Sequence, residues 1–169
     1  MGALIYWVED AKPPKFSDLG NPAWEQWLLQ GSVAPSTSIA HDLSDMLVFD
    51  YLIGNWDRFS GGNFKITKDN HRLILLDHNS GFGAPLRGKV HERVYQKLRQ
   101  VQKFSRTLYA GLLNLEITQL SSVLNGDTPH PILLSDAQIQ GVLDRRATIL
   151  SYIQSLIEIY GDTNVLTFE

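Results

Sequence analysis

The sequence contains no cysteine at all. This absence excludes disulfide bridges, zinc sites built from thiolates and catalysis by a cysteine nucleophile. Neither sign of charge is in large excess, because the sequence has 15 basic and 18 acidic residues and a formal net charge of −3. A chain without a basic excess is not expected to bind nucleic acid or another polyanion non-specifically.

Long apolar runs are missing as well. No stretch approaches the roughly 20 apolar residues needed to cross a bilayer, so we expect no membrane span. The N-terminus lacks a basic region and becomes acidic at Glu9 and Asp10, which argues against a signal peptide. Together with the lack of cysteine, this favours a cytoplasmic location.

The remaining composition is typical of a folded domain, with 43% hydrophobic and 20% charged residues. The 169 residues suffice for a single domain, or for one lobe of a larger catalytic unit. Periodicity and turn residues predict a mainly helical α+β fold. The expected strands cover residues 3–8, 63–67 and 72–76, and the expected helices cover residues 23–30, 38–53, 91–104, 105–113, 115–124 and 136–160.

The helix expected over residues 38–53 is apolar nearly all round in its second half, which indicates burial on most of its faces. Thr37 or Ser38 is its predicted N-cap, and Gly54-Asn55 is its predicted stop because both residues accept left-handed geometry. Asp50 lies in the apolar half and needs a polar partner if it is buried. Arg58, shortly after the helix, is the expected partner.

Three polar residues follow the ends of these rigid elements. Asp57 lies in the loop after the buried helix, Asn63 opens one expected strand, and Asp77 closes the returning strand, 20 residues after Asp57. A carboxylate and an amide oxygen side by side suit a hard divalent cation such as Mg²⁺ or Mn²⁺. A second carboxylate on a loop can orient a hydroxyl and accept its proton, and phosphoryl transfer needs both parts.

The hairpin register decides whether Asn63 and Asp77 meet. With a three-residue loop over residues 69–71, Asn63 opposes Asp77, and their Cβ atoms lie roughly 5 Å apart on one face. With a four-residue loop over residues 68–71, Asn63 opposes Leu76, and the two polar groups point to opposite faces. We favour the first register, because only that register lets both groups face one site.

Two segments carry a resemblance to a known family. Residues 49–59 (FDYLIGNWDRF) and 75–83 (LLDHNSGFG) resemble the C-terminal lobe of the four-jointed and Golgi casein-kinase group of secretory-pathway kinases, which belong with the atypical kinases. The Asp57-Arg58 pair is also similar to the catalytic loop of phosphatidylinositol 3- and 4-kinases. The opening segment, residues 2–8, is similar to the hinge strand of those lipid kinases. The resemblance covers roughly residues 1–85.

The resemblance implies a role for each matching residue. Asp57 matches the catalytic aspartate, Asp77 matches the metal aspartate, and Asn63 is the best match for the metal asparagine. ATP is the implied co-substrate, and Mg²⁺ or Mn²⁺ is the implied cation. The hinge residues implied to bind the nucleotide are Ile5, Tyr6, Trp7 and Val8. The family would also imply the secretory pathway, in contrast to the cytoplasmic location favoured above.

The chain departs from the family pattern at three points. Asn63 follows Asp57 by six residues, where kinases usually have five, and Phe59 replaces the lipid-kinase histidine. If residues 2–8 are the hinge, the N-terminal lobe with its phosphate-covering loop and its lysine is missing from the chain. A preceding segment or a separate chain would then have to supply it.

Other polar residues near these motifs are weaker candidates. Arg58 could touch phosphate, although pairing with Asp50 is the simpler interpretation. His78 follows Asp77 and could touch the nucleotide or only the loop backbone. Asn55 is more simply explained as a helix C-cap than as a site residue.

These observations together predict a protein-kinase-like C-terminal lobe, with the hinge strand near residues 3–8, the catalytic loop and metal hairpin over residues 55–83, and a helical remainder over residues 91–161. Its predicted function is ATP-dependent phosphotransfer to a hydroxyl of a protein or glycan. The alternative is a non-catalytic pseudokinase or helical interaction module. The missing N-terminal lobe favours this alternative, whereas the presence of Asp57 and Asp77 favours the kinase.

Overall fold

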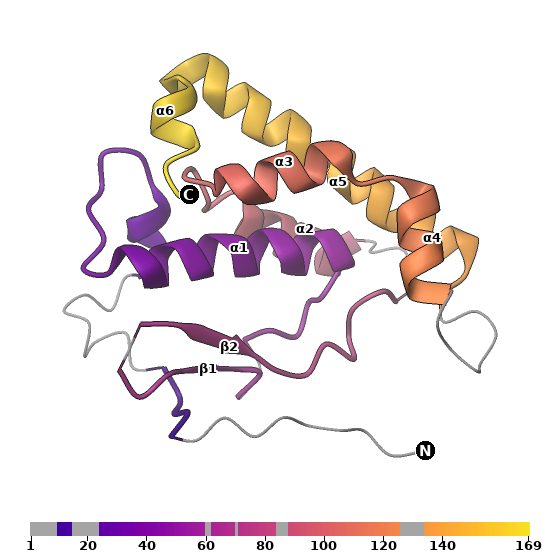
Figure 1. The fold of residues 1–169 in the computed structure, drawn as a ribbon, viewed down its shortest axis with the longest axis horizontal. Coiled ribbons are helices and arrows are strands. Elements are labelled where there is room, and N and C mark those ends of the chain that lie inside the picture. Colours follow the sequence, from indigo (N-terminus) through magenta and orange to yellow (C-terminus); the bar gives the residue numbers. More distant parts are fainter. Residues whose placement is uncertain (1–9, 15–23, 60–61, 70, 84–87, 126–133) are drawn as a thin grey trace.

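The computed structural model describes residues 10–14, 24–59, 62–69, 71–83, 88–125 and 134–169. These residues form helices around one central helix, with a two-stranded sheet on one side (Figure 1). The mainly helical α+β expectation is therefore confirmed. The elements are the 3-10 helix η2 (Trp24–Leu28), the helices α1 (Thr37–Ile53), α2 (Gly88–Leu98), α3 (Arg106–Asn114), α4 (Ile117–Asn125), α5 (Asp136–Tyr160) and α6 (Asp162–Val165), and the strands β1 (Phe64–Ile66) and β2 (Leu73–Leu75).

Helix α1 is the centre of the fold and contacts η2, α2, α5 and β2. In Figure 1 it lies between the hairpin on one side and α3 and α5 on the other. Ser36, rather than the predicted Thr37 or Ser38, caps its N-terminus by accepting a hydrogen bond from the Ile39 amide. The predicted stop is confirmed, because Gly54 adopts the left-handed conformation with φ of 76°. The loop that carries Asp57 therefore begins at the rigid end of a buried helix.

The hydrophobic core surrounds α1 on most of its circumference. Helix α1 itself contributes apolar residues on several faces, as its all-round apolar pattern predicts. The helix η2, the segment after α2 and the chain's C-terminal segment close the core from their sides. The fully buried members with the largest side chains include Trp27, Leu28, Ile39, Leu43, Met46, Tyr51, Leu98, Phe104 and Ile149.

The hairpin has the register that we did not favour. Phe64 pairs with Leu75 and Ile66 pairs with Leu73, and the Leu76 amide donates to the Asn63 carbonyl at 2.8 Å. Asn63 therefore opposes Leu76, and the predicted pairing of Asn63 with Asp77 is wrong. The four-residue loop is stabilised by side chains, since the Asp69 carboxylate accepts hydrogen bonds from Thr67 Oγ1 and the His71 amide.

The later helices differ from expectation mainly at their ends. Helix α2 begins at Gly88 and ends at Leu98, earlier than the predicted span of 91–104, and the short helix α6 was not predicted. Helix α5 begins at a Ser135 cap, where Ser135 and Gln138 form a reciprocal capping box. Backbone hydrogen bonds between Phe104 and the C-terminal residues then fasten the end of the chain to the core.

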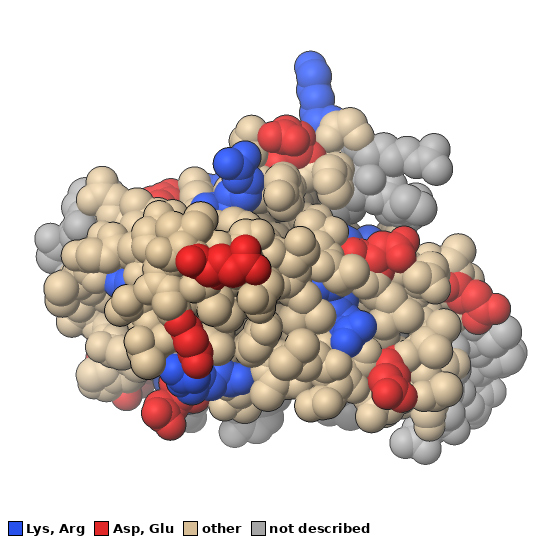
Figure 2. All heavy atoms as spheres, turned by 90° about the horizontal axis from the view of Figure 1, so that it is seen from above, with Lys and Arg blue, Asp and Glu red and all other residues tan. Residues whose placement is uncertain are grey.

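Parts of the predicted fold lie outside the described residues, namely the strand at residues 3–8 and the start of the helix at residues 23–30. Across the described part of the chain, no helix combines the length and the apolar character that a membrane span needs. The face over α3 and α5 carries scattered charges of both signs, with no concentration of basic residues (Figure 2).

Candidate active site

A buried ion pair lies beneath the candidate catalytic loop. Arg58 Nη2 lies 2.8 Å from Asp50 Oδ1, and the two side chains are only 1% and 6% exposed. Arg58 Nε donates to the same carboxylate at 2.9 Å. The expected pairing of these two residues is thus confirmed. Because a carboxylate in an apolar helix is costly without a partner, this pair allows α1 to be buried on nearly all faces.

The same arginine joins the loop to both strands of the hairpin. Arg58 Nη1 donates to the Asn63 carbonyl at 2.6 Å and to the Leu76 carbonyl at 2.7 Å. These two residues form the last backbone-bonded pair of the hairpin, next to Asp77. With its guanidinium buried and directed at protein acceptors, Arg58 is placed to position the site and not to touch phosphate.

Asn55 is also part of this buried network. Its Nδ2 donates to Asp50 Oδ1 at 3.0 Å, and its Oδ1 accepts from the Asp57 amide at 3.2 Å. We had expected Asn55 to be the helix C-cap, but the C-cap is Gly54. Asn55 is nevertheless structural, because it transmits the fixed position of Asp50 to the backbone of Asp57.

Asp57 is held from its other side by Asn63. The Asn63 Nδ2 donates to the Asp57 backbone carbonyl at 2.8 Å and approaches the carboxylate Oδ2 at 3.4 Å. The backbone of Asp57 is therefore fixed through its amide by Asn55 and through its carbonyl by Asn63. The sequence did not predict this contact, because we expected Asn63 to meet Asp77.

Asp77 lies where the second strand of the hairpin ends. It is exposed, and its backbone leaves the strand with φ of 48°, so the alternation of a strand does not extend to its side chain. Its Oδ1 accepts from the Asn79 amide at 3.3 Å. No hydrogen bond is seen between the described side chains of Asp77 and Asn63, and their joint metal site stays a prediction.

The loop after Asp77 is anchored at its far end. The Phe82 amide donates to the Ile53 carbonyl at 2.7 Å, and Gln138 Nε2 donates to the Phe82 carbonyl at 2.5 Å. Gly81 lies so close to α1 that a Cβ atom there would be 2.7 Å from Ile53 Cδ1. The sequence signal for Gln138 was its place in the capping box, but nothing in the pattern indicated that it reaches Phe82.

His78 packs beside the site, against Phe49 of α1. Its ring meets Phe49 edge to face at 5.5 Å between centroids. Partial burial, with the nearby positive charge of Arg58 as a smaller cause, lowers the pKa of His78 below its ordinary value. A neutral imidazole near neutral pH packs against an aromatic ring and can accept a hydrogen bond.

The oxygen donors at this end of the hairpin fit a hard cation only if phosphate oxygens and water complete its coordination shell. In the described ranges, no three His, Cys, Asp or Glu side chains gather as a metal site. Asp77 offers a carboxylate, and the Asn63 amide nitrogen is engaged by Asp57, which leaves its oxygen for a metal. Mg²⁺ commonly takes one or two protein oxygens, with phosphate oxygens and water supplying the rest.

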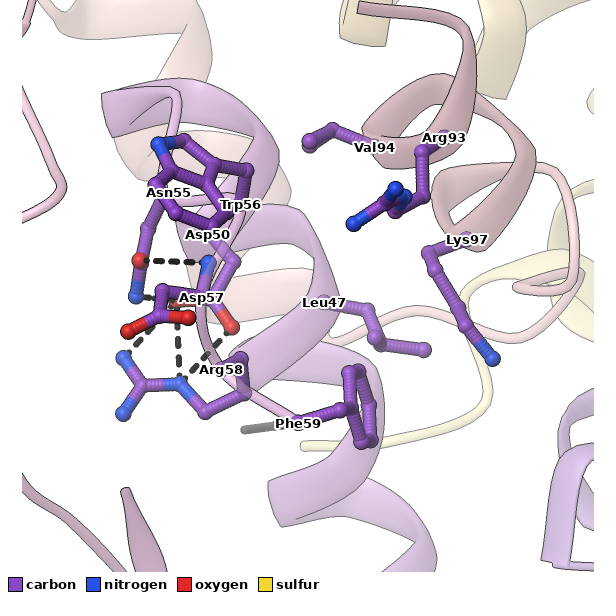
Figure 3. Close-up of a pocket in the computed structure, with 10 residues that line it drawn as sticks. All are labelled: Leu47, Asp50, Asn55, Trp56, Asp57, Arg58, Phe59, Arg93, Val94 and Lys97. Atoms are coloured by element: carbon purple, nitrogen blue, oxygen red, sulfur yellow. Dashed lines mark hydrogen bonds and ion pairs between the residues drawn. The ribbon is translucent and has the colours of Figure 1, made fainter. Parts of the chain in front are cut away.

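A pocket of about 300 Å³ adjoins the candidate catalytic loop (Figure 3). Residues 55–59 form one side of it, and Arg93, Val94 and Lys97 of α2 face them across the opening. The α2 residues were not among the site residues expected from the sequence. The signal that could have found them is the spacing of Arg93 and Lys97, which places two cations on one helical face beside an apolar residue.

The family model described as Golgi casein kinase, C-terminal, Fam20 matches residues 30–165. A human glycosaminoglycan xylosylkinase is 32% identical over 133 residues, covering 74% of this chain and 31% of the relative. A Drosophila melanogaster protein named extracellular serine/threonine protein CG31145 is 42% identical over 123 residues, covering 70% and 23%. Mouse pseudokinase FAM20A is 32% identical over 131 residues, covering 72% and 23%.

The solved structure of hydra Fam20 with sugar has the same fold, with a TM-score of 0.58 and 20% sequence identity over 73% of this chain and 36% of that one. The chain thus spans about a quarter to a third of the length of the curated relatives named above. The expected cytoplasmic location finds no support among these relatives. The resemblance found in the two motifs is confirmed, and the chain belongs to the Fam20 family of Golgi casein kinases, matching its C-terminal region.

Proposed function

We propose that this protein is the catalytic lobe of a kinase that transfers the γ-phosphoryl group of ATP to a hydroxyl of a protein or glycan. The observation that carries the proposal is the double fixation of Asp57 by Asn55 and Asn63, at the end of a buried helix. Positioning and electrostatics supply most of the catalysis of phosphoryl transfer, so a rigidly held carboxylate is the feature this reaction requires.

The proposed roles follow from the placement of each carboxylate. Asp57 orients the acceptor hydroxyl and takes its proton as the oxygen bonds to the γ-phosphorus, while the bond to the β–γ bridging oxygen breaks and ADP leaves. Asp77, with the Asn63 oxygen, holds Mg²⁺ or Mn²⁺. The bound cation neutralises charge on the phosphates. Ile5, Tyr6, Trp7 and Val8 stay the predicted nucleotide-binding hinge, outside the described residues.

Names among the relatives support two further parts of the proposal. The family description includes the Golgi, and relatives are called extracellular, which supports a secretory-pathway location. One relative is a xylosylkinase and another is a serine/threonine protein kinase, which supports a glycan or protein acceptor. A pseudokinase is among the relatives as well. The second candidate function is therefore a protein that binds nucleotide but does not transfer its phosphate.

The test separates the two carboxylates. Calorimetric titration of ATP in the presence of Mn²⁺ is run on the chain together with the segment that supplies its N-terminal lobe, and on Asp77→Asn and Asp57→Asn in the same protein. We expect Asp77→Asn to weaken metal-dependent ATP binding at least about tenfold, because it removes the charge facing the cation. Asp57→Asn should keep ATP binding within about twofold but lose transfer of radiolabelled phosphate to an acceptor, since Asp57 acts on the hydroxyl.

The control is Asp144→Asn, which changes an exposed carboxylate on α5. It should bind ATP as the unchanged chain does. Equal binding by Asp77→Asn and the unchanged chain would contradict the metal role. Metal-dependent ATP binding without any transfer, in a protein that also contains the N-terminal lobe, would support the pseudokinase instead.

A further inference from the structure

The pocket beside the catalytic loop has an apolar interior and aromatic walls (Figure 3). Leu47 of α1 and Val94 of α2 are buried to 2% and 6% exposure and form its base. Trp56 and Phe59, on either side of Asp57 and Arg58 in sequence, remain 47% and 43% exposed. Large aromatic side chains half exposed around an apolar base are typical of a surface that binds a ligand.

The wall formed by Phe59 is held in a fixed orientation. Its ring stacks on Trp24 at 5.7 Å between centroids and meets Phe64 edge to face at 5.7 Å. The Lys97 ammonium lies 4.9 Å from the centroid of the Phe59 ring and 5.5 Å from that of Trp24. Since three neighbours orient this ring, the pocket is preformed and its ligand does not have to order it.

Positive charge lies at the rim opposite the loop. Arg93 and Lys97 are one turn apart on α2 and both line the pocket. Lys97 has a partial partner in Glu25, at 3.9 Å. Arg93 is exposed and makes no hydrogen bond or ion pair with any residue in the described part of the chain. An anionic group on a ligand would therefore meet an uncompensated guanidinium there.

Uncharged polar groups are few in this pocket. They are the Asn55 amide, which is 2% exposed and already bonded to Asp50 and Asp57, and the Trp56 indole N–H; the other polar groups in the lining are charged. Hydroxyls of a saccharide placed over Leu47 and Val94 would lie against an apolar base without hydrogen-bond partners. In a peptide, an apolar side chain matches the apolar base of the pocket, and a neighbouring acidic side chain matches its positive rim.

We propose that this pocket binds a peptide segment in which an apolar side chain adjoins an acidic residue, with the apolar side chain between Trp56 and Phe59 and the acid against Arg93. Asp57 lines the same pocket, so such a segment flanks the hydroxyl to be phosphorylated. The proposal rests on the proposed kinase function only for this last step. It selects a protein over a glycan as the acceptor and makes the apolar side chain its anchor.

The test uses three fluorescein-labelled peptides and the complete chain, without nucleotide or metal. The first peptide is Gly-Glu-Phe-Gly-Ser-Gly, the second has Gln in place of Glu, and the third has Ser in place of Phe. Fluorescence anisotropy measures the affinity of each. We expect the first peptide to bind more tightly than either of the others, because only it satisfies both the apolar base and the positive rim.

Two surface variants assign each contribution to a residue. Arg93→Gln should weaken the Glu peptide about fivefold and leave the Gln peptide unchanged, as expected for one partly exposed ion pair. Trp56→Ala should weaken the Phe peptide at least about tenfold and leave the Ser peptide unchanged. The matched control is Arg99→Gln, since Arg99 is an exposed arginine just after α2 that does not line the pocket.

Other outcomes overturn the proposal. Peptide affinities that are equal in all variants would show that the pocket is not the binding site. Competition by the neutral disaccharide lactose that is lost in Trp56→Ala would make the pocket a sugar site. Nucleotide and metal are omitted from the peptide test. A failure of ATP binding would therefore leave a positive peptide result intact, and a failure of peptide binding would leave a positive ATP result intact.

Discussion

Arg58 is the residue on which the geometry of the candidate site depends most. Its guanidinium contacts the Asp50 carboxylate and the carbonyls of Asn63 and Leu76, from three different segments. An arginine can do this because its five N–H donors form a planar fork, whereas a lysine ammonium is a compact donor on a flexible stem. The site therefore requires arginine at this position, and a positive charge alone does not replace it.

The first prediction concerns Arg58→Lys. We expect it to lower the free energy of unfolding by about 3 kcal/mol, because buried acceptors lose their donors while Asp50 keeps only part of its compensation. Urea denaturation followed by circular dichroism measures this change. Arg106→Lys is the control, since the pair of Arg106 with Asp162 is largely exposed and should change stability by less than about 1 kcal/mol. Equal effects of both variants would contradict the assigned role.

Residue roles could be predicted from the sequence where a local rule applied. Asp50 in an apolar helix required a partner, and Arg58 was the nearest suitable cation, so that pair was found. The contact between Asn63 and Asp57 was missed. It depends on where two ends of a loop meet in space, and neither spacing nor composition contains that information.

At the scale of elements, the hairpin shows why register is hard to predict. A shared metal site favoured the three-residue loop, but side-chain hydrogen bonds stabilise the four-residue loop instead. Asp42 on α1 is distant in sequence from the hairpin. Its carboxylate accepts hydrogen bonds from the Leu73 amide at 2.7 Å and from Arg72 Nε at 3.1 Å. This contact fixes the start of β2 against α1. A one-residue change of register reverses every side chain, so a contact with a residue distant in sequence bears on which face each residue occupies.

The contact between α5 and the loop after Asp77 leads to the second prediction. Gln138 Oε1 accepts from the Ser135 amide at 2.9 Å and caps α5, while its Nε2 holds the Phe82 carbonyl. Gln138→Glu keeps the capping acceptor but removes the donor to Phe82. We expect unchanged helix content, and amide exchange at Gly81 and Phe82 that is faster by about tenfold.

Hydrogen exchange followed by NMR measures this loop directly. The control is Gln119→Glu, because Gln119 also accepts a hydrogen bond at a helix start, from the Glu116 amide of the segment before α4. That variant should leave Gly81 and Phe82 unchanged. Wild-type exchange at these amides in Gln138→Glu would show that the Ile53 carbonyl alone anchors the loop.

At the scale of the whole molecule, the helical architecture was the part most open to prediction. Helix α1 follows from its long apolar run and its stop at Gly54, and α5 follows from apolar residues at helical spacing; these are local properties. The end of α2 and the existence of α6 depend on how the C-terminal segment pairs with residues near Phe104. Such closure brings together residues that are far apart in sequence, and local patterns do not contain it.

Stability as a function of pH is a further property of the whole fold, and Asp45 on α1 contributes to it. Burial raises the pKa of the Asp45 carboxyl from 3.8 to about 6, against a smaller opposing effect of His41. Within the described residues, its Oδ1 is buried without a hydrogen-bond partner. Between about pH 4 and pH 6 the native state thus binds more protons than the unfolded chain, and stability falls as pH rises through this range.

The third prediction follows from this sign. Asp45→Asn removes the ionisable group, so it should stabilise the protein above pH 6 and have little effect below pH 4. Since the Asp45 side chain is 38% exposed and the substitution also removes its pair with His41, we expect a gain of only about 1 kcal/mol at pH 7.5. Thermal unfolding of both proteins between pH 4 and pH 8 gives the difference curve. A difference that is constant across this range would mean that Asp45 does not titrate there, and a loss of stability at pH 7.5 would mean that its pair with His41 outweighs the cost of burying its charge.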